Sequence, residues 1–123
     1  MNILAIDYGT KQIGIAYSVK GIISPLPSLK NNNLVLMEIK EIINQYSIAK
    51  IYVGLSEGRI AKLTLQFVTK LQAMLELPIE TVEEAVSTIE ATEIFFKNKK
   101  NKKDYNKLID SVAAAVILRR VIS

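Results

Sequence analysis

The first thirty residues alternate apolar and polar positions with the spacing of β-strands. Residues 3–6 form a continuous apolar run, which is typical of a short strand covered on both faces. Residues 12–19 alternate apolar with polar or small side chains, so we predict a second strand that returns antiparallel after a turn at residues 8–11. Residues 20–24 predict a third strand, which we expect to stop at Pro25. The chain is therefore expected to begin as a three-stranded meander.

The middle of the chain changes to the spacing of helices. Apolar side chains between residues 36 and 46 recur every three or four positions, which predicts an amphipathic helix. The same spacing predicts a second helix over residues 60–74, which ends before Pro78. Strands are predicted at residues 50–55, which are rich in β-branched and aromatic side chains, and at residues 79–82.

The last third of the chain is expected to be helical. The sequence STIE at residues 87–90 matches a capping box, in which the serine accepts from a first-turn amide and the glutamate reaches back to the cap amide. We predict a third helix from there to about residue 96, a lysine-rich connection at residues 97–103, and a final helix over about residues 105–121.

This order of elements predicts an α/β fold. Helices between the later strands require parallel crossovers, whereas the first three strands are joined by turns. We expect a mixed five-stranded sheet flanked by helices. Residues 1–123 are expected to form a single domain, because a chain of this length buries one core of ordinary size.

Composition restricts the chemistry that the chain can perform. It has no cysteine and no histidine, which excludes disulfides, thiolate metal sites, histidine general bases and Ser-His or Cys-His nucleophile pairs. Carboxylates or lysines must therefore carry any reaction. No apolar run approaches the roughly 18 residues of a membrane span, and the N-terminus lacks a secretory signal pattern, so we expect a cytoplasmic protein without a membrane partner.

Four acidic residues occupy positions where such chemistry is expected. Asp7 follows the first strand, Glu83 and Glu84 follow the last strand, and Asp110 interrupts an apolar stretch of the final helix. The carboxyl ends of parallel strands meet at one edge of a sheet. Carboxylates gathered there repel one another unless a cation such as Mg²⁺ joins them, and two such ions about 4 Å apart hydrolyse phosphodiesters without histidine or cysteine. Asp7 could instead cap a turn, and the glutamates could be charges favoured by a helix dipole.

Four segments, in order along the chain, resemble one known family. They are ILAIDYGTKQIGIA, IYVGL, LPIETVEEAVSTIEA and IDSVAAAVIL. These segments resemble the YqgF/RuvX family of bacterial ribonuclease-H-like proteins, which are described as Holliday junction resolvases or pre-16S rRNA nucleases. The resemblance spans nearly the whole chain and implies a ribonuclease-H-like nuclease domain.

Carried over residue by residue, the resemblance implies a metal site. It makes Asp7, Glu84 and Asp110 the catalytic residues and the ligands of Mg²⁺ or Mn²⁺, with two ions expected, and Glu83 an auxiliary acid. The implied reaction is hydrolysis of phosphodiester bonds, either to process the 5′ end of pre-16S rRNA in ribosome biogenesis or to resolve branched DNA. The implied partners are structured RNA precursor or branched DNA, and ribosomal particles. The sequence leaves open whether the chain acts as a monomer or a homodimer.

Lysines are the candidate contacts for nucleic acid. Lys11 lies in the turn beside Asp7, and the sequence KNKKNKK at residues 97–103 holds five of the 16 basic residues of the chain. In a chain of net charge +4, such a cluster attracts polyanions, although exposed lysines are often only solvated. Besides Lys11, the expected nucleic-acid contacts in the cluster are Lys99, Lys100, Lys102 and Lys103.

Three departures from the family pattern keep other functions open. Gln12 and Ala85 stand where the family usually has arginine, and the segment GLSEGR lacks the family's proline. Arginine clamps phosphate through two hydrogen bonds, so its loss would favour a nucleic-acid-binding module that no longer cleaves efficiently. The sequence Asp-x-Gly-Thr also resembles the phosphate loop of actin-like ATPases and sugar kinases, but those need two lobes, for which 123 residues leave no room.

Overall fold

A computed structural model of the chain describes residues 1–56, 58–83 and 102–122, with the backbone alone for residues 102–110. The strands in these ranges are β1 (Ile3–Asp7), β2 (Gln12–Val19), β3 (Ile22–Lys30), β4 (Lys50–Leu55) and β5 (Ile79–Glu83). The helices are α1 (Val35–Gln45), α2 (Arg59–Met74) and α4 (Lys102–Ile122).

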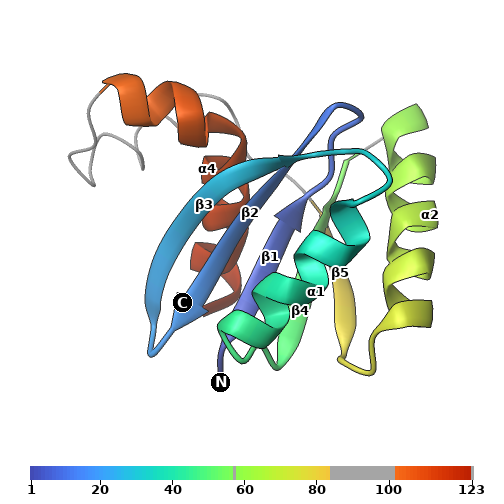
Figure 1. Cartoon of the computed structure of the whole chain (residues 1–123), viewed down its shortest axis with the longest axis horizontal. Coiled ribbons are helices and arrows are strands. Elements are labelled where there is room, and N and C mark those ends of the chain that lie inside the picture. Colours follow the sequence, from blue (N-terminus) through green and yellow to red (C-terminus); the bar gives the residue numbers. More distant parts are fainter. Residues whose placement is uncertain (57, 84–101, 123) are drawn as a thin grey trace.

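The strands form one mixed sheet in the order β3-β2-β1-β4-β5. β1 is antiparallel to β2 and parallel to β4, and β4 is parallel to β5. The three parallel strands therefore end at one edge of the sheet, the upper edge in Figure 1, which we call the carboxyl end. There Asp7 lies opposite Gly54 of β4, and Leu55 lies opposite Glu83 of β5. The prediction of a mixed five-stranded α/β sheet is confirmed.

Helices cover both faces of the sheet (Figure 1). α1 and α2 pack on one face, in a core that joins Leu4 and Ile6 of β1 to Ile39 of α1 and Phe67 of α2. α4 covers the other face and packs against Ala5 of β1 in a separate buried cluster. Successive residues of β1 thus alternate between the two layers, as the pleat of a strand requires.

Small side chains line the contact between α4 and the sheet. Ala5 of β1 and Ala16 of β2 are opposite each other in the register, and both are fully buried. They share a cluster with Ala114 and Ala115 of α4, which are also buried. Because none of these side chains extends beyond Cβ, the helix axis can lie close to the strands.

One buried hydrogen bond fixes α4 along β2. The Oγ of Ser111 accepts a hydrogen bond of 3.0 Å from the backbone N–H of Ile15, and Ser111 is fully buried. The register of β2 against β3 shifts at this point, between Ile13 and Ile15. A buried backbone N–H at such an irregularity needs a partner from elsewhere in the fold, and α4 provides it.

The third strand is longer than predicted. We expected residues 20–24 to stop at Pro25, whereas β3 continues through Pro25 and Pro27 to Lys30. That prediction was wrong because β3 is an edge strand, where proline is tolerated since its missing N–H can face away from the neighbouring strand. The register shift also falls at Pro27, between the pairs that β3 forms on either side of it.

The other expected elements agree closely where the structure describes them. The strands at residues 12–19 and 50–55 have the expected bounds, and the final helix begins at Lys102 rather than near residue 105. The helix predicted at residues 87–96 lies outside the described residues. Within the described ranges, no helix is long and apolar enough to cross a membrane.

Replacing Gly9 by alanine should destabilise the fold through the turn between β1 and β2. A Cβ at this position would overlap the backbone carbonyl oxygen of Gln12, so the turn must shift. We expect Gly9→Ala to lower the free energy of unfolding by about 2 kcal/mol. In the control Gly21→Ala, the new Cβ meets open space and only the left-handed backbone, φ 80°, is unfavourable, so the loss is about 1 kcal/mol. Urea denaturation measures both, and an equal or smaller loss in Gly9→Ala would contradict the steric argument.

Removing the Ser111 hydroxyl should loosen α4 at one point of the sheet. Ser111→Ala leaves the N–H of Ile15 buried without its acceptor, which should lower the free energy of unfolding by about 1–3 kcal/mol. Amide hydrogen exchange followed by NMR gives a local readout. We expect exchange at Ile15 to accelerate more than exchange at Leu4 or Ile51 in the central strands, and uniform acceleration along the sheet would argue against this specific bond.

Candidate active site

Asp7 lies at the carboxyl end of the central strand, on the face that α4 covers. Ala5, two residues earlier, packs in the α4 cluster, whereas Leu4 and Ile6 pack in the core with α1 and α2. Side chains two residues apart on a strand share a face, so Asp7 belongs to the α4 side. Its side chain is partly buried.

Glycine stands beside Asp7 on both neighbouring strands. Gly14 of β2 and Gly54 of β4 are its partners in the register, and both are buried. Neither neighbour carries a side chain that could cover the Asp7 carboxylate within the sheet. No sequence pattern indicated that these two glycines flank Asp7, because the register that places them there depends on residues distant in sequence.

The backbone of Asp110 lies on α4 near the level of Asp7. Asp110 directly precedes Ser111, whose hydroxyl is bonded to the N–H of Ile15, and Ile15 follows Gly14 on β2. It is also one helical turn before Ala114, which packs on the sheet. The fold thus brings two of the predicted acidic positions, which are far apart in the sequence, to the same end of one face.

The structure separates Glu83 from Asp7. On β5, Ile79 packs with the α1 and α2 core and Val82 packs with the α4 cluster, so the alternation puts Glu83 on the α1 and α2 face. Glu83 is exposed, and β4 lies between its strand and β1. Glu84 lies outside the described residues, and the side chain of Asp110 is not described. Among the described side chains, no three acidic groups gather closely enough to hold a metal ion.

The loop between β1 and β2 is held in place by Asn31, which follows β3. The Asn31 side-chain amide donates to the carbonyl oxygen of Gly9 at 2.9 Å, and its backbone N–H donates to the carbonyl oxygen of Lys11 at 2.9 Å. These bonds fix the loop next to Asp7 and hold the exposed Lys11 at the carboxyl end. No motif indicated this role, because Asn31 lies in a short polar stretch, residues 30–33, between two predicted elements.

The structure describes only some of the other predicted nucleic-acid contacts. Lys102 and Lys103 form the first turn of α4, but only their backbone is described. Lys99 and Lys100 lie outside the described residues. Lys11 has a described side chain, which is exposed, and it lies in the loop that follows Asp7.

Known proteins similar in sequence match this chain over nearly its whole length. A relative from Halothermothrix orenii, named "Putative pre-16S rRNA nuclease", is 33% identical over 129 residues, covering 97% of this chain and 92% of its own. A relative of the same name from Rickettsia typhi is 30% identical, covering 98% of this chain and 84% of its own.

Solved structures of Holliday junction resolvases are similar in fold. RuvC of T. thermophilus in complex with a Holliday junction substrate superposes with a TM-score of 0.62 at 12% identity, covering 99% of this chain and 96% of that one. The fowlpox virus resolvase superposes with a TM-score of 0.64 at 12% identity, covering 99% and 97%. At this identity the likeness shows the fold, which is ribonuclease-H-like.

A family model described as "RuvX: Holliday junction resolvase" matches residues 1–123. The match runs through the segments of Asp7 and Asp110 and covers the whole sheet. The resemblance inferred from the sequence motifs is confirmed by this match and by the relatives. The chain belongs to the RuvX family.

Proposed function

We propose that residues 1–123 form one nuclease domain that hydrolyses phosphodiester bonds with two divalent ions and processes the 5′ end of pre-16S rRNA in the cytoplasm. The observation that carries the proposal is the position of Asp7. It ends a central strand between two glycines, on the same face as the Asp110 segment of α4, which is tied to β2 through Ser111. The names of the Halothermothrix and Rickettsia relatives favour ribosomal RNA precursor as the substrate.

The acidic residues fit a site for Mg²⁺ or Mn²⁺. Carboxylate oxygens are the ligands that these hard cations prefer, and they leave coordination positions for water and phosphate oxygens. We propose Asp7, Glu84 and Asp110 as the ligands. Glu83 faces away from Asp7, which favours Glu84 as the acid contributed after β5. When bound, the ions supply an activated water and stabilise the leaving oxygen of the cleaved phosphodiester.

The chain's own residues would position the phosphate. Because Gly14 and Gly54 have no side chains, a phosphate group can approach the Asp7 carboxylate without displacing a neighbour. Lys11, held at the carboxyl end by the bonds of Asn31, can supply a cation to that phosphate. Gln12 and Ala85 supply no such charge, so the positive charge for the transition state would come from other cations, such as Lys11, and from the ions.

Resolution of branched DNA is the second candidate function. The family model that matches the whole chain is described as a Holliday junction resolvase, which favours this substrate over an unbranched one. A resolvase cuts two strands related by a two-fold axis, so this function would require a symmetric dimer. A third outcome, binding without cleavage, would make the chain a binding module.

Replacing either aspartate proposed as a metal ligand by asparagine should abolish cleavage without unfolding the protein. We expect Asp7→Asn and Asp110→Asn each to reduce the cleavage rate by about 10²-fold or more, because a neutral amide is a poor ligand for a divalent ion. The substrates are a pre-16S rRNA fragment and a four-way DNA junction, each with Mg²⁺ or Mn²⁺. Glu41→Gln is the matched control, since Glu41 is exposed on α1, on the opposite face of the sheet.

The comparison of substrates decides between the candidates. Cleavage of the RNA alone supports precursor processing, and symmetric cuts in the junction support resolution. If wild-type protein binds both substrates and cleaves neither, the nuclease proposal is wrong.

Glu83 and Glu84 should differ in their effect on cleavage. Since Glu83 lies on the face opposite Asp7, we expect Glu83→Gln to keep most of the activity and Glu84→Gln to lose about 10²-fold. Titration calorimetry with Mn²⁺ should show weaker uptake in Glu84→Gln alone. The reverse order of effects would assign the metal ligand to Glu83.

A further inference from the structure

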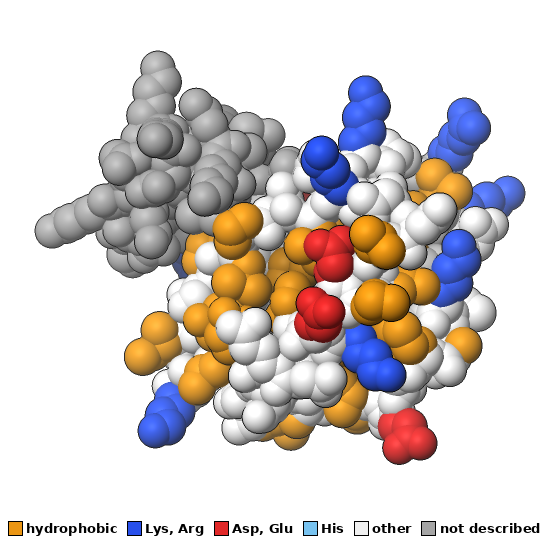
Figure 2. All heavy atoms as spheres, viewed as in Figure 1, with side chains coloured by type: hydrophobic (Ala, Val, Ile, Leu, Met, Phe, Trp, Pro, Cys, Tyr) orange, Lys and Arg blue, Asp and Glu red, His pale blue; other side chains and the backbone are white. Residues whose placement is uncertain are grey.

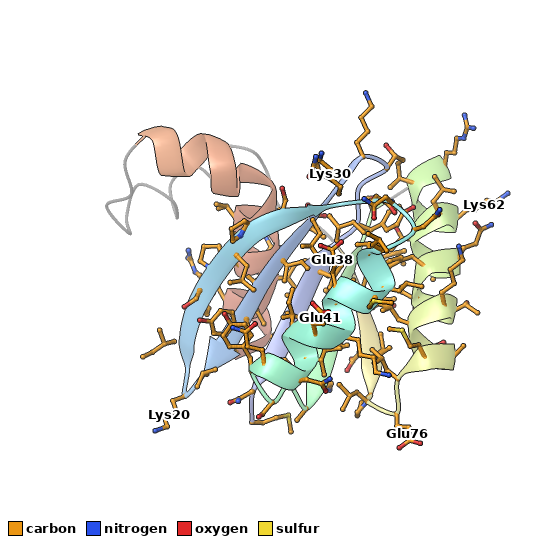
Figure 3. All side chains as sticks on the ribbon, viewed as in Figure 1. Lys20, Lys30, Glu38, Glu41, Lys62 and Glu76 are labelled. Atoms are coloured by element: carbon orange, nitrogen blue, oxygen red, sulfur yellow. The ribbon has the colours of Figure 1, made fainter. Side chains whose placement is uncertain are left out.

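Four exposed cations surround the carboxyl end of the sheet. Lys11 lies in the loop after β1. Lys30, the last residue of β3, is the register partner of Gln12, which directly follows Lys11. Arg59 and Lys62 lie in the first turn of α2, which begins four residues after β4 ends. Figure 3 shows Lys30 and Lys62 at this end of the molecule, and Lys20 and Glu76 at the other. Of the four cations, the sequence had indicated only Lys11.

These cations differ from the paired lysine on the same sheet. Lys50 of β4 forms an ion pair of 3.0 Å with Glu80 and lies over the ring of Tyr52. Lys11, Lys30, Arg59 and Lys62 form no ion pair with any residue of the described ranges. Within the part of the chain that the structure describes, their side chains are therefore exposed without an acidic partner. Figure 2 shows several cationic side chains along the upper and right edges of the molecule and no acidic one among them, and further cations lie lower on this face.

The loop between β1 and β2 lies between the two pairs of cations, and contacts on both of its sides hold it in place. On the β3 side, Asn31 bonds to Gly9 and Lys11, as described above. On the α2 side, the ring of Tyr8 contacts the ring of Phe67, with centroids 5.1 Å apart. Tyr8 directly follows Asp7, so the same loop joins the candidate active site to both pairs of cations. A ligand that bridges the pairs would cross the carboxyl end of β1, the strand that Asp7 ends.

The surface between the cations is long enough to contact several phosphates of one nucleic-acid strand. From β3 to β4 there are three strand spacings, which at about 4.8 Å each amount to about 14 Å. One strand of a duplex presents a phosphate about every 3.4 Å along its axis, and because the strand winds around that axis its phosphates are farther apart in space, so fewer than about four consecutive phosphates fit in this length. Glu83, exposed at the end of β5, limits the cationic surface on the far side.

We propose that Lys11, Lys30, Arg59 and Lys62 form a phosphate track, which binds the sugar-phosphate backbone of the nucleic-acid arm that leads to Asp7. The inference rests on the proposed nuclease function for the identity of the ligand. It adds the direction from which the nucleic acid reaches the site, across the β1–β2 loop toward α2. The contacts are to phosphates, so they contribute affinity and orientation rather than sequence preference.

Two triple variants with the same change in net charge test the track. Lys30→Gln/Arg59→Gln/Lys62→Gln removes three cations of the phosphate track. Lys20→Gln/Lys40→Gln/Lys70→Gln removes three exposed lysines elsewhere. Binding of a fluorescein-labelled RNA duplex with a single-stranded 5′ extension, and of a labelled four-way DNA junction, is followed by anisotropy in EDTA over a series of KCl concentrations. EDTA prevents metal-dependent cleavage during the measurement.

We expect the track variant to bind at least about tenfold more weakly than the wild type. The slope of its log affinity against log salt concentration should be smaller in magnitude by about 2 to 3. The control variant should change that slope by less than about 1. Equal effects of the two variants, or absence of binding by the wild type, would overturn the track. Asp7→Asn should bind like the wild type. If the wild type shows the expected slopes but does not cleave, the nuclease proposal alone is contradicted, and if it cleaves but the two variants have equal slopes, the track alone is contradicted.

Discussion

The hydrogen bond between the N–H of Ile15 and the hydroxyl of Ser111 sets the position of helix α4 on the sheet. The surrounding contacts are apolar, from the alanines of both layers to Ile117 and Leu118 of α4, and apolar contacts are non-directional. A buried N–H without an acceptor is costly, so a slide of α4 along β2 would be opposed by this one group. The same position of α4 brings the Asp110 segment to the level of Asp7, and the candidate site depends on it.

Much of the fold follows from local patterns in the sequence. The alternation at residues 12–19 and the β-branched run at residues 50–55 define their strands correctly, since both strands are central and well covered. The extent of β3 could not be predicted in this way. Whether a proline ends a strand depends on whether the strand has a neighbour on that side, and the neighbour is determined by the topology of the sheet.

Part of the candidate site could also be predicted from the sequence, and part could not. Asp7 and Asp110 were recognisable as acids in apolar surroundings, and the register supports their position on one face. The face on which Glu83 lies could not be predicted from the sequence, because the face of a strand residue is assigned only by what packs against its strand, here at Ile79 and Val82. Asn31, Lys30, Arg59 and Lys62 become neighbours of the site through the turn after β3 and the crossover after β4, which no short motif indicates.

The prolines of β3 also restrict how two copies of this chain can associate. An edge strand with free N–H groups can pair with the same strand of another molecule and extend the sheet, which often leads to uncontrolled assembly. Pro25 and Pro27 remove two donors from this edge, and the register shift beside Pro27 bends its regular ladder. Joining of two sheets through β3 is therefore disfavoured, and a symmetric pair would have to be built from helical surfaces or from the opposite margin of the sheet.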